Sequence, residues 1–414
     1  MASPLAVAWT APAQAVPTTR VNRIVLAAFY VMVFSFNFEM PDRGGGEIPA
    51  MTAALFIAST PLAFRVCYGR VPAALYWFAG FLWVYLVASL VHGWVDMGDV
   101  RHYFIVLVEA AIVCWASVNL FNREGIGTTA LWCFVYSALA RSVLPMLGIG
   151  RTSYAVWTGG ERMTAFGQNA NFSAILLSAG LVTLLGLTFG RPKASPRMRL
   201  AALPMGVLIG AAIIETGSRG GLMALAAGML ALMFTAGGNL KVRLRNGIVM
   251  GLAIGALGYS AFTATVMKNR LEATAETGTL AGREQLWPSL VEMALEKPWL
   301  GWGPVNNQYE VASRTTDMAK EHRDAHNLLL ELMTAEGLAG TAPFLIGLGL
   351  CVAGAWRGRT SPYGIVPFAL IALFLVANIS TNLAAYKPFW WVLALALGSA
   401  SLAPQKEGTR PCAV

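Results

Sequence analysis

Three polar residues stand out in a chain that is otherwise rich in apolar side chains. Arg219 lies in a short Gly-Ser-Arg-Gly-Gly turn, Arg283 follows a glycine, and His326 lies within Asp-Ala-His-Asn. Histidine titrates near neutral pH and can serve as a general base. A charged side chain in or near a membrane span marks a candidate functional site.

Each of the three also has a simpler structural explanation. Arg219 would extend from a membrane interface into water, Arg283 would be a solvated residue at the start of a helix, and His326 would be a polar anchor. A charge in or near an apolar span is nevertheless a functional-site hypothesis by default. Arg219 also falls on the side of the membrane where positive charge is disfavoured. We therefore keep all three as candidate catalytic residues.

His322 precedes His326 by four residues, a spacing that also suits two zinc ligands on one helical face. No convincing third ligand is present, and neither histidine is followed by the glutamate of a metalloprotease. We expect no metal and no cofactor. As candidate substrate-binding residues we add His322, together with Arg162, Asn171 and Trp287.

Composition indicates what kind of scaffold positions these residues. Of 414 residues, 56% are hydrophobic and only 12% are charged, whereas a soluble domain carries roughly 25% charged residues. The net charge of +9 comes from short basic stretches between apolar segments, which is the positive-inside pattern of membrane proteins. We therefore expect contacts with membrane lipids and no binding to nucleic acid.

Apolar segments long enough to approach the ~20 residues of a membrane-spanning helix recur along the chain. We predict an all-α polytopic membrane protein with about twelve transmembrane helices and a single integral membrane domain over 1–414. The predicted spans are 23–40, 48–64, 72–92, 100–121, 126–148, 171–190, 200–215, 220–236, 246–266, 326–354, 363–380 and 386–402.

The distribution of Lys and Arg among the connecting loops predicts that both termini are cytoplasmic. Two longer loops, 149–170 and 267–325, then lie outside, and the second is a large, partly helical periplasmic loop. Within it, Leu286, Leu290 and Met293 share one helical face. Pro288 suits a first helical turn, so we expect this helix to begin near Trp287. We expect a second helix from near Thr316 through His326 into the next span.

The order of the motifs around these residues resembles the O-antigen ligase and polymerase superfamily. The large loop before the third-from-last span agrees with it, and the recognisable motifs cover about 162–350. The motifs are Arg162 with Gln168-Asn-Ala-Asn171, Gly217-Ser-Arg-Gly-Gly221, Gly282-Arg-Glu-Gln-Leu-Trp287, Gly301-Trp-Gly-Pro304, Ala325-His-Asn-Leu-Leu-Leu-Glu331 and Glu336-Gly337.

Within that superfamily the chain looks most like the O-antigen ligases. The resemblance implies a fold like that of class C glycosyltransferases and a periplasmic active site in the bacterial inner membrane. It implies transfer of a polysaccharide from an undecaprenyl-pyrophosphate-linked donor to lipid A-core, by metal-independent inverting displacement. The two arginines and the histidine on which the family relies match Arg219, Arg283 and His326.

Other functions remain open at this point. An O-antigen polymerase would use the same donor but lengthen a lipid-linked chain. A protein O-oligosaccharyltransferase usually carries a larger periplasmic C-terminal region than this chain has. A transporter would also suit twelve spans, but it is expected to show paired polar breaks in both halves of the chain, and we find none.

Overall fold

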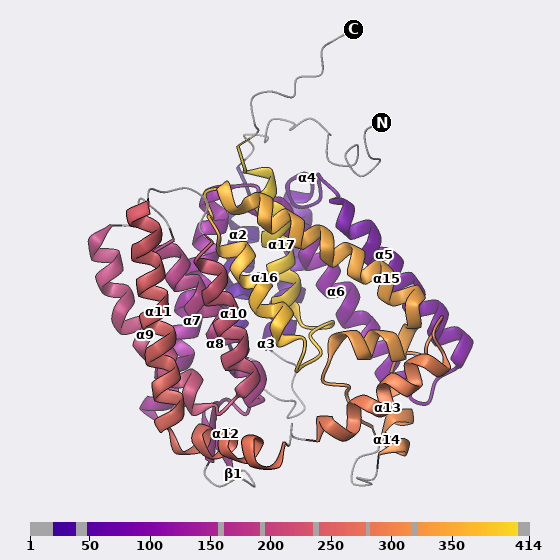
Figure 1. Ribbon diagram of the computed structural model, residues 1–414. Helices are drawn as coiled ribbons and strands as arrows, with labels where there is room; N and C mark the ends of the chain where they lie inside the picture. The colour runs from indigo at the N-terminus through magenta and orange to yellow at the C-terminus, as the bar shows by residue number, and fades with distance from the viewer. Residues whose placement is uncertain are drawn as a thin grey trace.

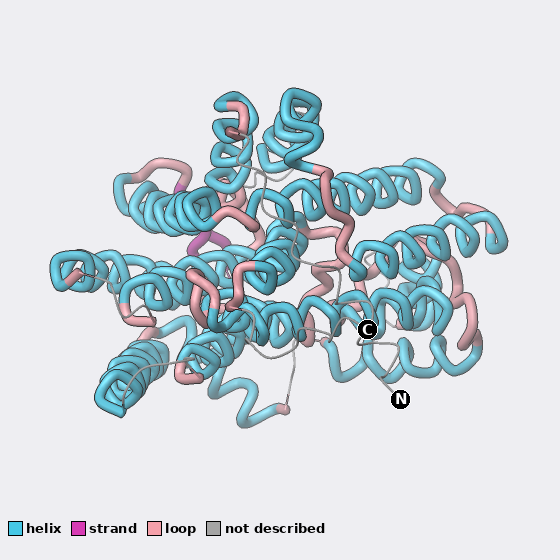
Figure 2. Tube along the Cα trace, turned by 90° about the horizontal axis from the view of Figure 1, so that it is seen from above, coloured by secondary structure: helices cyan, strands magenta, loops and turns pink. Residues whose placement is uncertain are grey.

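Helices make up almost all of the chain in the computed structural model, which describes residues 20–38, 48–155, 161–190, 195–234, 240–278, 282–315 and 322–404. Figure 1 shows these helices running side by side, and Figure 2 shows the same bundle from above. The predicted all-α class is thus confirmed for the described residues, apart from one short hairpin.

Each of the twelve predicted apolar segments contains a helix. These helices are α2 (Arg23–Ser35), α3 (Ile48–Ser59), α5 (Ala73–His92), α6 (Met97–Phe121), α7 (Glu124–Val143), α8 (Ala170–Thr188), α9 (Pro196–Glu215), α10 (Arg219–Leu232), α11 (Leu240–Thr263), α15 (Leu328–Arg357), α16 (Val366–Ala377) and α17 (Lys387–Ser401).

Fewer of the described helices than predicted have the length and hydropathy of a full membrane span. Within the described ranges, seven helices are long and apolar enough to cross a membrane, or eight if the bent pair α11 and α12 counts as one span. Helices α2, α10 and α16 are apolar but shorter. The 14 residues of α10 give a length of about 21 Å, less than the ~30 Å hydrocarbon core. Twelve full spans are therefore not confirmed.

Hydrogen bonds bring several of the basic connections together at one end of the bundle. The backbone carbonyl of Arg70 accepts bonds from Trp115 of α6 (2.7 Å) and Asn119 (3.0 Å), and the Tyr363 hydroxyl donates to the carbonyl of Arg123 (3.2 Å). The helices of the large loop lie at the opposite end, at the bottom of Figure 1.

The core is built on the two most completely buried helices, α8 and α17. Trp390 and Trp391 of α17 are fully buried, and Trp390 contacts Phe78 of α5 and Phe344 of α15 edge-on. A helix that is apolar on all sides must be surrounded by other helices or lipid. Such burial fixes the position of α17 and therefore of the loop that precedes it.

Residues 149–170 contain a feature that we had not predicted. Strands β1 (Arg151–Ala155) and β2 (Glu161–Ala165) form an antiparallel hairpin in which Arg151 pairs with Ala165. The hairpin connects the end of α7 to the start of α8, so it fixes the approach of Arg162 to the rest of the bundle.

The large loop contains three helices, α12 (Thr265–Thr277), α13 (Arg283–Glu296) and α14 (Asn306–Arg314). Helix α13 begins at Arg283 and not near Trp287, and Pro288 lies inside it. Pro288 is exposed, so its ring faces outward. The packing of Leu286 and Leu290 in a small satellite core keeps the helix intact across the proline.

The predicted helix through His326 is wrong in its described part. Residues 322–327 are not helical, α15 begins at Leu328, and the segment 316–321 that includes Thr316 lies outside the described residues. Asn327 caps α15 by accepting a bond from Leu330 N (3.1 Å). His322 and His326 therefore do not share a helical face.

Helix α15 also contains a break that receives the glycine-rich turn after α13. Gly337 has φ 61° and ψ −161°, and the freed backbone groups pair with the turn. Leu338 N donates to Pro298 O (2.7 Å) and Trp302 N donates to Thr334 O (2.7 Å). In this turn Trp299 is exposed and Trp302 is half-buried.

Candidate functional site

Arg219 is the first residue of α10, and a tight turn determines where it lies. Gly217 has φ 61°, a backbone conformation that favours glycine. Ser218 caps the helix, with its Oγ accepting a bond from Gly221 N (3.1 Å). A helix N-terminus carries partial positive charge, so the guanidinium and the helix end both favour an anion. The Arg219 guanidinium also contacts the carbonyl of Arg270 in α12, at 3.5 Å.

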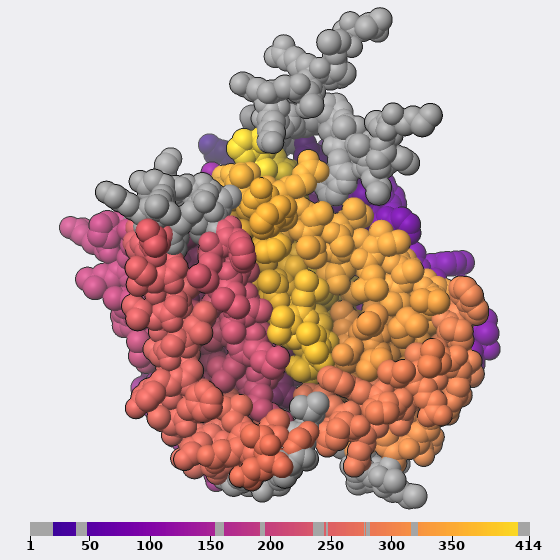
Figure 3. All heavy atoms as spheres, in the orientation of Figure 1, coloured from indigo at the N-terminus to yellow at the C-terminus, as the bar shows by residue number. Residues whose placement is uncertain are grey.

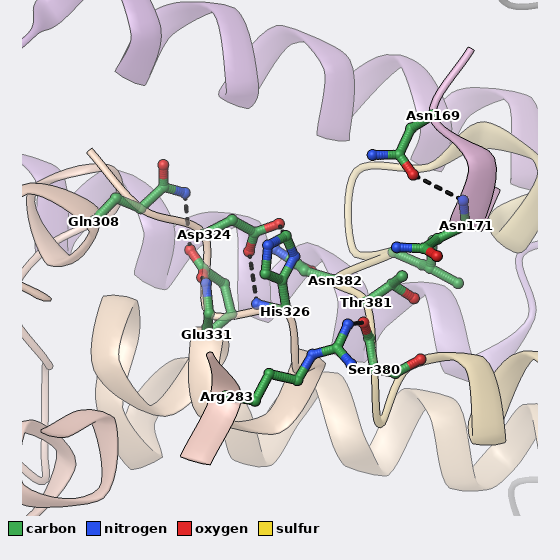
Figure 4. A network of polar contacts seen from close by, with 12 residues as sticks. Asn169, Asn171, Arg283, Gln308, Asp324, His326, Glu331, Ser380, Thr381 and Asn382 are labelled. Carbon is green, nitrogen blue, oxygen red and sulfur yellow. Dashed lines mark hydrogen bonds and ion pairs between the residues drawn. The ribbon is translucent and has the colours of Figure 1, made fainter. Parts of the chain in front are cut away.

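Arg283 is likewise the first residue of its helix, α13. Its Nη2 donates to the carbonyl of Ser380 (2.8 Å), which belongs to the segment between α16 and α17 (Figure 4). Burial lowers the pKa of Arg283, and the positive charge of Arg219 lowers it further. The two guanidinium groups are therefore close enough to repel each other, and the carboxyl groups of Asp324 and Glu284 partly offset this repulsion.

Ser380 also contacts the start of α10. A β-carbon built on Gly220 would stand 2.4 Å from Ser380 Oγ, so only glycine fits there without movement of the serine. Gly220, which follows Arg219, is thus in direct contact with Ser380, whose carbonyl accepts the bond from Arg283. Segment 378–382, which contains Ser380, brings together two arginines that are 64 positions apart in the sequence.

The same segment anchors the chain beside His326. Asn327 Nδ2 donates to Ile379 O (3.2 Å), and Leu328 N donates to Asn378 O (3.0 Å). His326 itself has φ 49°, and its side chain is 52% exposed. The imidazole is therefore held near the segment that contacts both arginines, while remaining accessible to a substrate.

Arg162 and Asn171 form a buried support under the turn before Arg219. Arg162 is 7% exposed, and it donates from Nε to Thr216 O (2.7 Å) and from Nη2 to Asn171 Oδ1 (3.0 Å). The same Asn171 oxygen accepts a bond from Ser218 Oγ (3.0 Å). These bonds join β2, α8 and the start of α10.

The remaining two candidates, Trp287 and His322, lie in different surroundings. Trp287 is half-buried, and it lines a hollow of about 820 Å³ along α13 together with Arg283, Val291 and Leu295. His322 is exposed, and its ring lies 5.8 Å from that of Tyr309 in α14. Trp287 therefore lies on the same open face of α13 as Arg283.

Figure 3 shows how the elements of the site meet at the surface. The yellow C-terminal helices are exposed between the red region of α11 and α12 and the orange region of α13 and α15. Among the described residues, no group of three His, Cys, Asp or Glu side chains is placed to hold a metal ion. The cationic groups that the site offers to an anion are therefore arginine side chains.

Sequence reasoning missed three residues that this geometry brings forward: Ser380, Asp324 and Glu331. Ser380 contributes a backbone carbonyl, which leaves no sequence signal. Asp324 lies two residues before His326, and its Oδ2 is 3.6 Å from the imidazole Nδ1. That spacing in the sequence was a usable signal, because a carboxylate next to a histidine commonly orients it.

Two comparisons with known proteins agree with the motifs. A family model described as O-Antigen ligase matches residues 204–345. A protein of Pseudomonas aeruginosa named O-antigen ligase is 28% identical over 224 residues, which cover 53% of this chain and 50% of that protein. The chain thus matches about half the length of this relative. Both matches include the turn at Arg219 or its helix, and the family match extends past His326. Residues 204–345, which carry Arg219, Arg283 and His326, are thus the part of this chain that is similar to the O-antigen ligase family.

Proposed function

We propose that this protein transfers a polysaccharide from an undecaprenyl-pyrophosphate-linked donor to lipid A-core. The observation that carries the proposal is the meeting of three elements at segment 378–382. Gly220 touches Ser380, Arg283 donates to its carbonyl, and Asn327 donates to the neighbouring carbonyl of Ile379. In this proposal these contacts gather the two arginines and an accessible imidazole around the segment.

Arg219 and Arg283 bind the diphosphate of the donor in this proposal. Cleavage of the sugar–phosphate bond moves negative charge onto the departing oxygen, and guanidinium groups stabilise that charge through bidentate, charge-assisted bonds. The lowered pKa of Arg283, caused by burial and by Arg219, fits a site that is completed by an anion. Loss of one such contact costs about 2–4 kcal/mol in the transition state.

His326 acts as the general base. Its imidazole takes the proton from the attacking hydroxyl of the acceptor, a role that contributes roughly 10²–10⁴ in rate. The oxygen then attacks the anomeric carbon opposite the leaving diphosphate, which inverts that centre. The exposed side chain of His326 leaves room for an acceptor sugar, and no metal is needed because the arginines neutralise the leaving group.

The remaining candidates support this arrangement in different ways. Arg162 and Asn171 hold the turn before Arg219, so we assign them to positioning the diphosphate site instead of direct contact with the sugar. Trp287 lines the hollow beside Arg283, where an aromatic ring suits the sugar or the lipid of the donor. His322, next to Tyr309, is assigned to the outer wall of the acceptor site.

We place the reaction on the periplasmic face of the inner membrane. The basic loops around Arg70 and Arg123 lie at the end of the bundle opposite α12, α13 and α14, and Lys and Arg are enriched in cytoplasmic loops. Both termini are then cytoplasmic. The large loop 267–325 is periplasmic, where a flipped lipid-linked donor and lipid A-core meet.

Reconstitution tests the proposed reaction directly. The purified protein is incubated with lipid-linked O-polysaccharide and lipid A-core in a metal chelator, and the conjugate is detected on a gel. We expect conjugate from the wild type and none above background from Arg219→Ala, Arg283→Ala or His326→Ala. Exposed Glu124→Gln, at the start of α7, is the matched control and keeps full activity.

The alternatives predict different products in the same assay. Lengthening of the donor with lipid A-core unchanged would replace the ligase by a polymerase. Full activity in His326→Ala would overturn its role as the base, and full activity in Arg219→Ala with Arg283→Ala would overturn the diphosphate site.

A further inference from the structure

A pair of carboxyl groups lies directly beside His326. Asp324 Oδ1 accepts a hydrogen bond from the backbone N–H of His326 (3.2 Å), and Oδ2 lies 3.6 Å from the imidazole Nδ1. Figure 4 shows Asp324 between the imidazole and Glu331, with Asn382 nearby. The carboxyl group therefore lies beside the histidine, close to the segment 378–382 and to α15.

Glu331 is held from every side by hydrogen-bond donors. Its Oε1 accepts bonds from Asn307 Nδ2 (3.1 Å) and Gln308 Nε2 (3.1 Å), and its Oε2 accepts one from Ala325 N (3.1 Å). Glu331 is 7% exposed, whereas the side chain of Asp324 is 38% exposed.

The difference in exposure decides which carboxyl group is the better partner for an imidazolium. A charge costs more free energy in the buried position than in the exposed one, so Asp324 carries a negative charge more readily than Glu331. Arg283 of α13 and Tyr103 of α6 also interact electrostatically with Asp324. Burial raises the pKa of Asp324, whereas the positive charge of Arg283 favours its ionised form.

We propose that Asp324 is the positioning residue for His326. Asp324 turns Nδ1 toward itself, so that Nε2 faces the acceptor hydroxyl. This inference rests on the proposed role of His326 as the base, and it adds the group that directs the ring and stabilises its charged form.

The distances fit a contact that strengthens during the reaction. At 3.6 Å the Nδ1 and Oδ2 atoms are too far apart for a strong hydrogen bond. When His326 Nε2 takes the hydroxyl proton, the new oxygen–carbon bond forms, the carbon–oxygen bond to the diphosphate breaks, and the diphosphate leaves with the electron pair. The imidazolium that results faces the Asp324 carboxylate, and the opposite charges attract.

A titration of the histidine tests the contact independently of transfer activity. The protein is labelled with ¹⁵N-histidine in lipid nanodiscs, and the signal of His326 is identified as the one absent from His326→Gln. A carboxylate favours the imidazolium, so we expect the titration midpoint of His326 to fall by roughly one pH unit in Asp324→Asn. Glu124→Gln, at the far end of the bundle, leaves the midpoint unchanged. An unchanged midpoint in Asp324→Asn would overturn the inference.

Transfer kinetics test the consequence for the reaction. We expect Asp324→Asn to lower kcat by about 10–100-fold with little change in KM for the lipid-linked donor. The acidic limb of the pH–kcat profile should move to lower pH, and Asp324→Glu should recover part of the rate. A merely structural role would lower the yield of folded protein without moving the profile, and an unmoved profile therefore rejects the inference.

The two measurements also separate this inference from the proposed function. If the wild type transfers no polysaccharide but Asp324→Asn shifts the His326 midpoint, the proposed function fails while the contact stands. If transfer occurs and the midpoint is unchanged, the function stands and the positioning role of Asp324 is rejected.

Discussion

Gly337 of α15 lies directly against the backbone of Trp299, although the two residues belong to different elements. A β-carbon on Gly337 would stand 2.4 Å from the carbonyl carbon of Trp299. The relationship is reciprocal, because a β-carbon on Gly301 would stand 2.5 Å from the carbonyl oxygen of Thr334. The two glycine motifs of the sequence are therefore one structural joint between the large loop and α15.

We predict that Gly337→Ala destabilises the protein. The φ and ψ of Gly337, 61° and −161°, belong to a region that only glycine occupies readily, at a cost of about 1–3 kcal/mol for other residues. The clash with Trp299 adds to that cost, and the atoms involved are backbone. Thermal unfolding in detergent, followed by tryptophan fluorescence, should show a lower Tm.

Gly349→Ala is the matched control for this prediction. Gly349 lies in the same helix, and a β-carbon there would have nothing within 4 Å. Because alanine is the better helix former, Gly349→Ala should keep or slightly raise the Tm. Equal Tm values for Gly337→Ala and the wild type would show that the joint does not constrain α15.

Gly220 offers a more local test of the site. In Gly220→Ala the new methyl group meets Ser380 Oγ, so the serine or the start of α10 must move. A displacement of about 1 Å costs roughly 10²-fold in rate at the extreme, and we expect a loss of about tenfold in transfer. Adding Ser380→Gly removes the obstructing hydroxyl, keeps the carbonyl that accepts from Arg283, and should restore most of the rate.

A control and a contrary result complete this test. Gly258→Ala in α11 introduces the same methyl group where nothing lies within 4 Å, and it should leave transfer unchanged. If the Gly220→Ala single variant transfers at the wild-type rate, the contact between α10 and segment 378–382 does not set the distance between the arginines.

The sequence predicted the helices and the polar residues better than it predicted their meeting place. Apolar length located α8 and α17, because burial leaves a periodicity-free run of hydrophobic residues. The carbonyl of Ser380 could not be foreseen, since every residue has one. Pro288 led to a helix start four residues too late, because tertiary packing of Leu286 and Leu290 outweighed the local preference. The i, i+4 spacing of the two histidines was also misleading. Asn327 caps α15, so the helix begins only after both of them.

The contact between α13 and α14 should depend on pH. Arg314 makes a two-bond ion pair with Glu296, at 2.7 Å for each bond, and these bonds lower the pKa of Glu296 from its ordinary value of 4.5. A carboxyl whose folded pKa is lowered contributes stability above its unfolded pKa and loses it as the pH falls through the folded value. The pair therefore holds α14 fully at neutral pH and weakens below about pH 4.5.

Hydrogen exchange in the backbone amides of α14 measures this effect. We expect protection of 306–314, corrected for the intrinsic pH dependence of exchange, to fall as the pH is lowered below 4.5. Glu296→Gln should show the reduced protection already at pH 7 and little further change on acidification. A wild-type profile that does not vary between pH 3 and pH 7 would mean that the apolar contact of Val311 with Leu290 holds α14 without the ion pair.

Cysteine labelling decides the orientation on which the periplasmic site depends. Glu272 of α12 is exposed and lies in the large loop, and Glu124 of α7 is exposed and lies on the basic side of the chain. Each is replaced by cysteine in a variant that lacks the five native cysteines. A membrane-impermeant maleimide added to intact cells with a permeable outer membrane should label Glu272→Cys, and should reach Glu124→Cys only after lysis. The donor diphosphate and lipid A-core must both reach Arg219, Arg283 and His326 from the labelled side. The reverse labelling pattern would place these residues on the side away from the acceptor, and would therefore overturn the proposed transferase function.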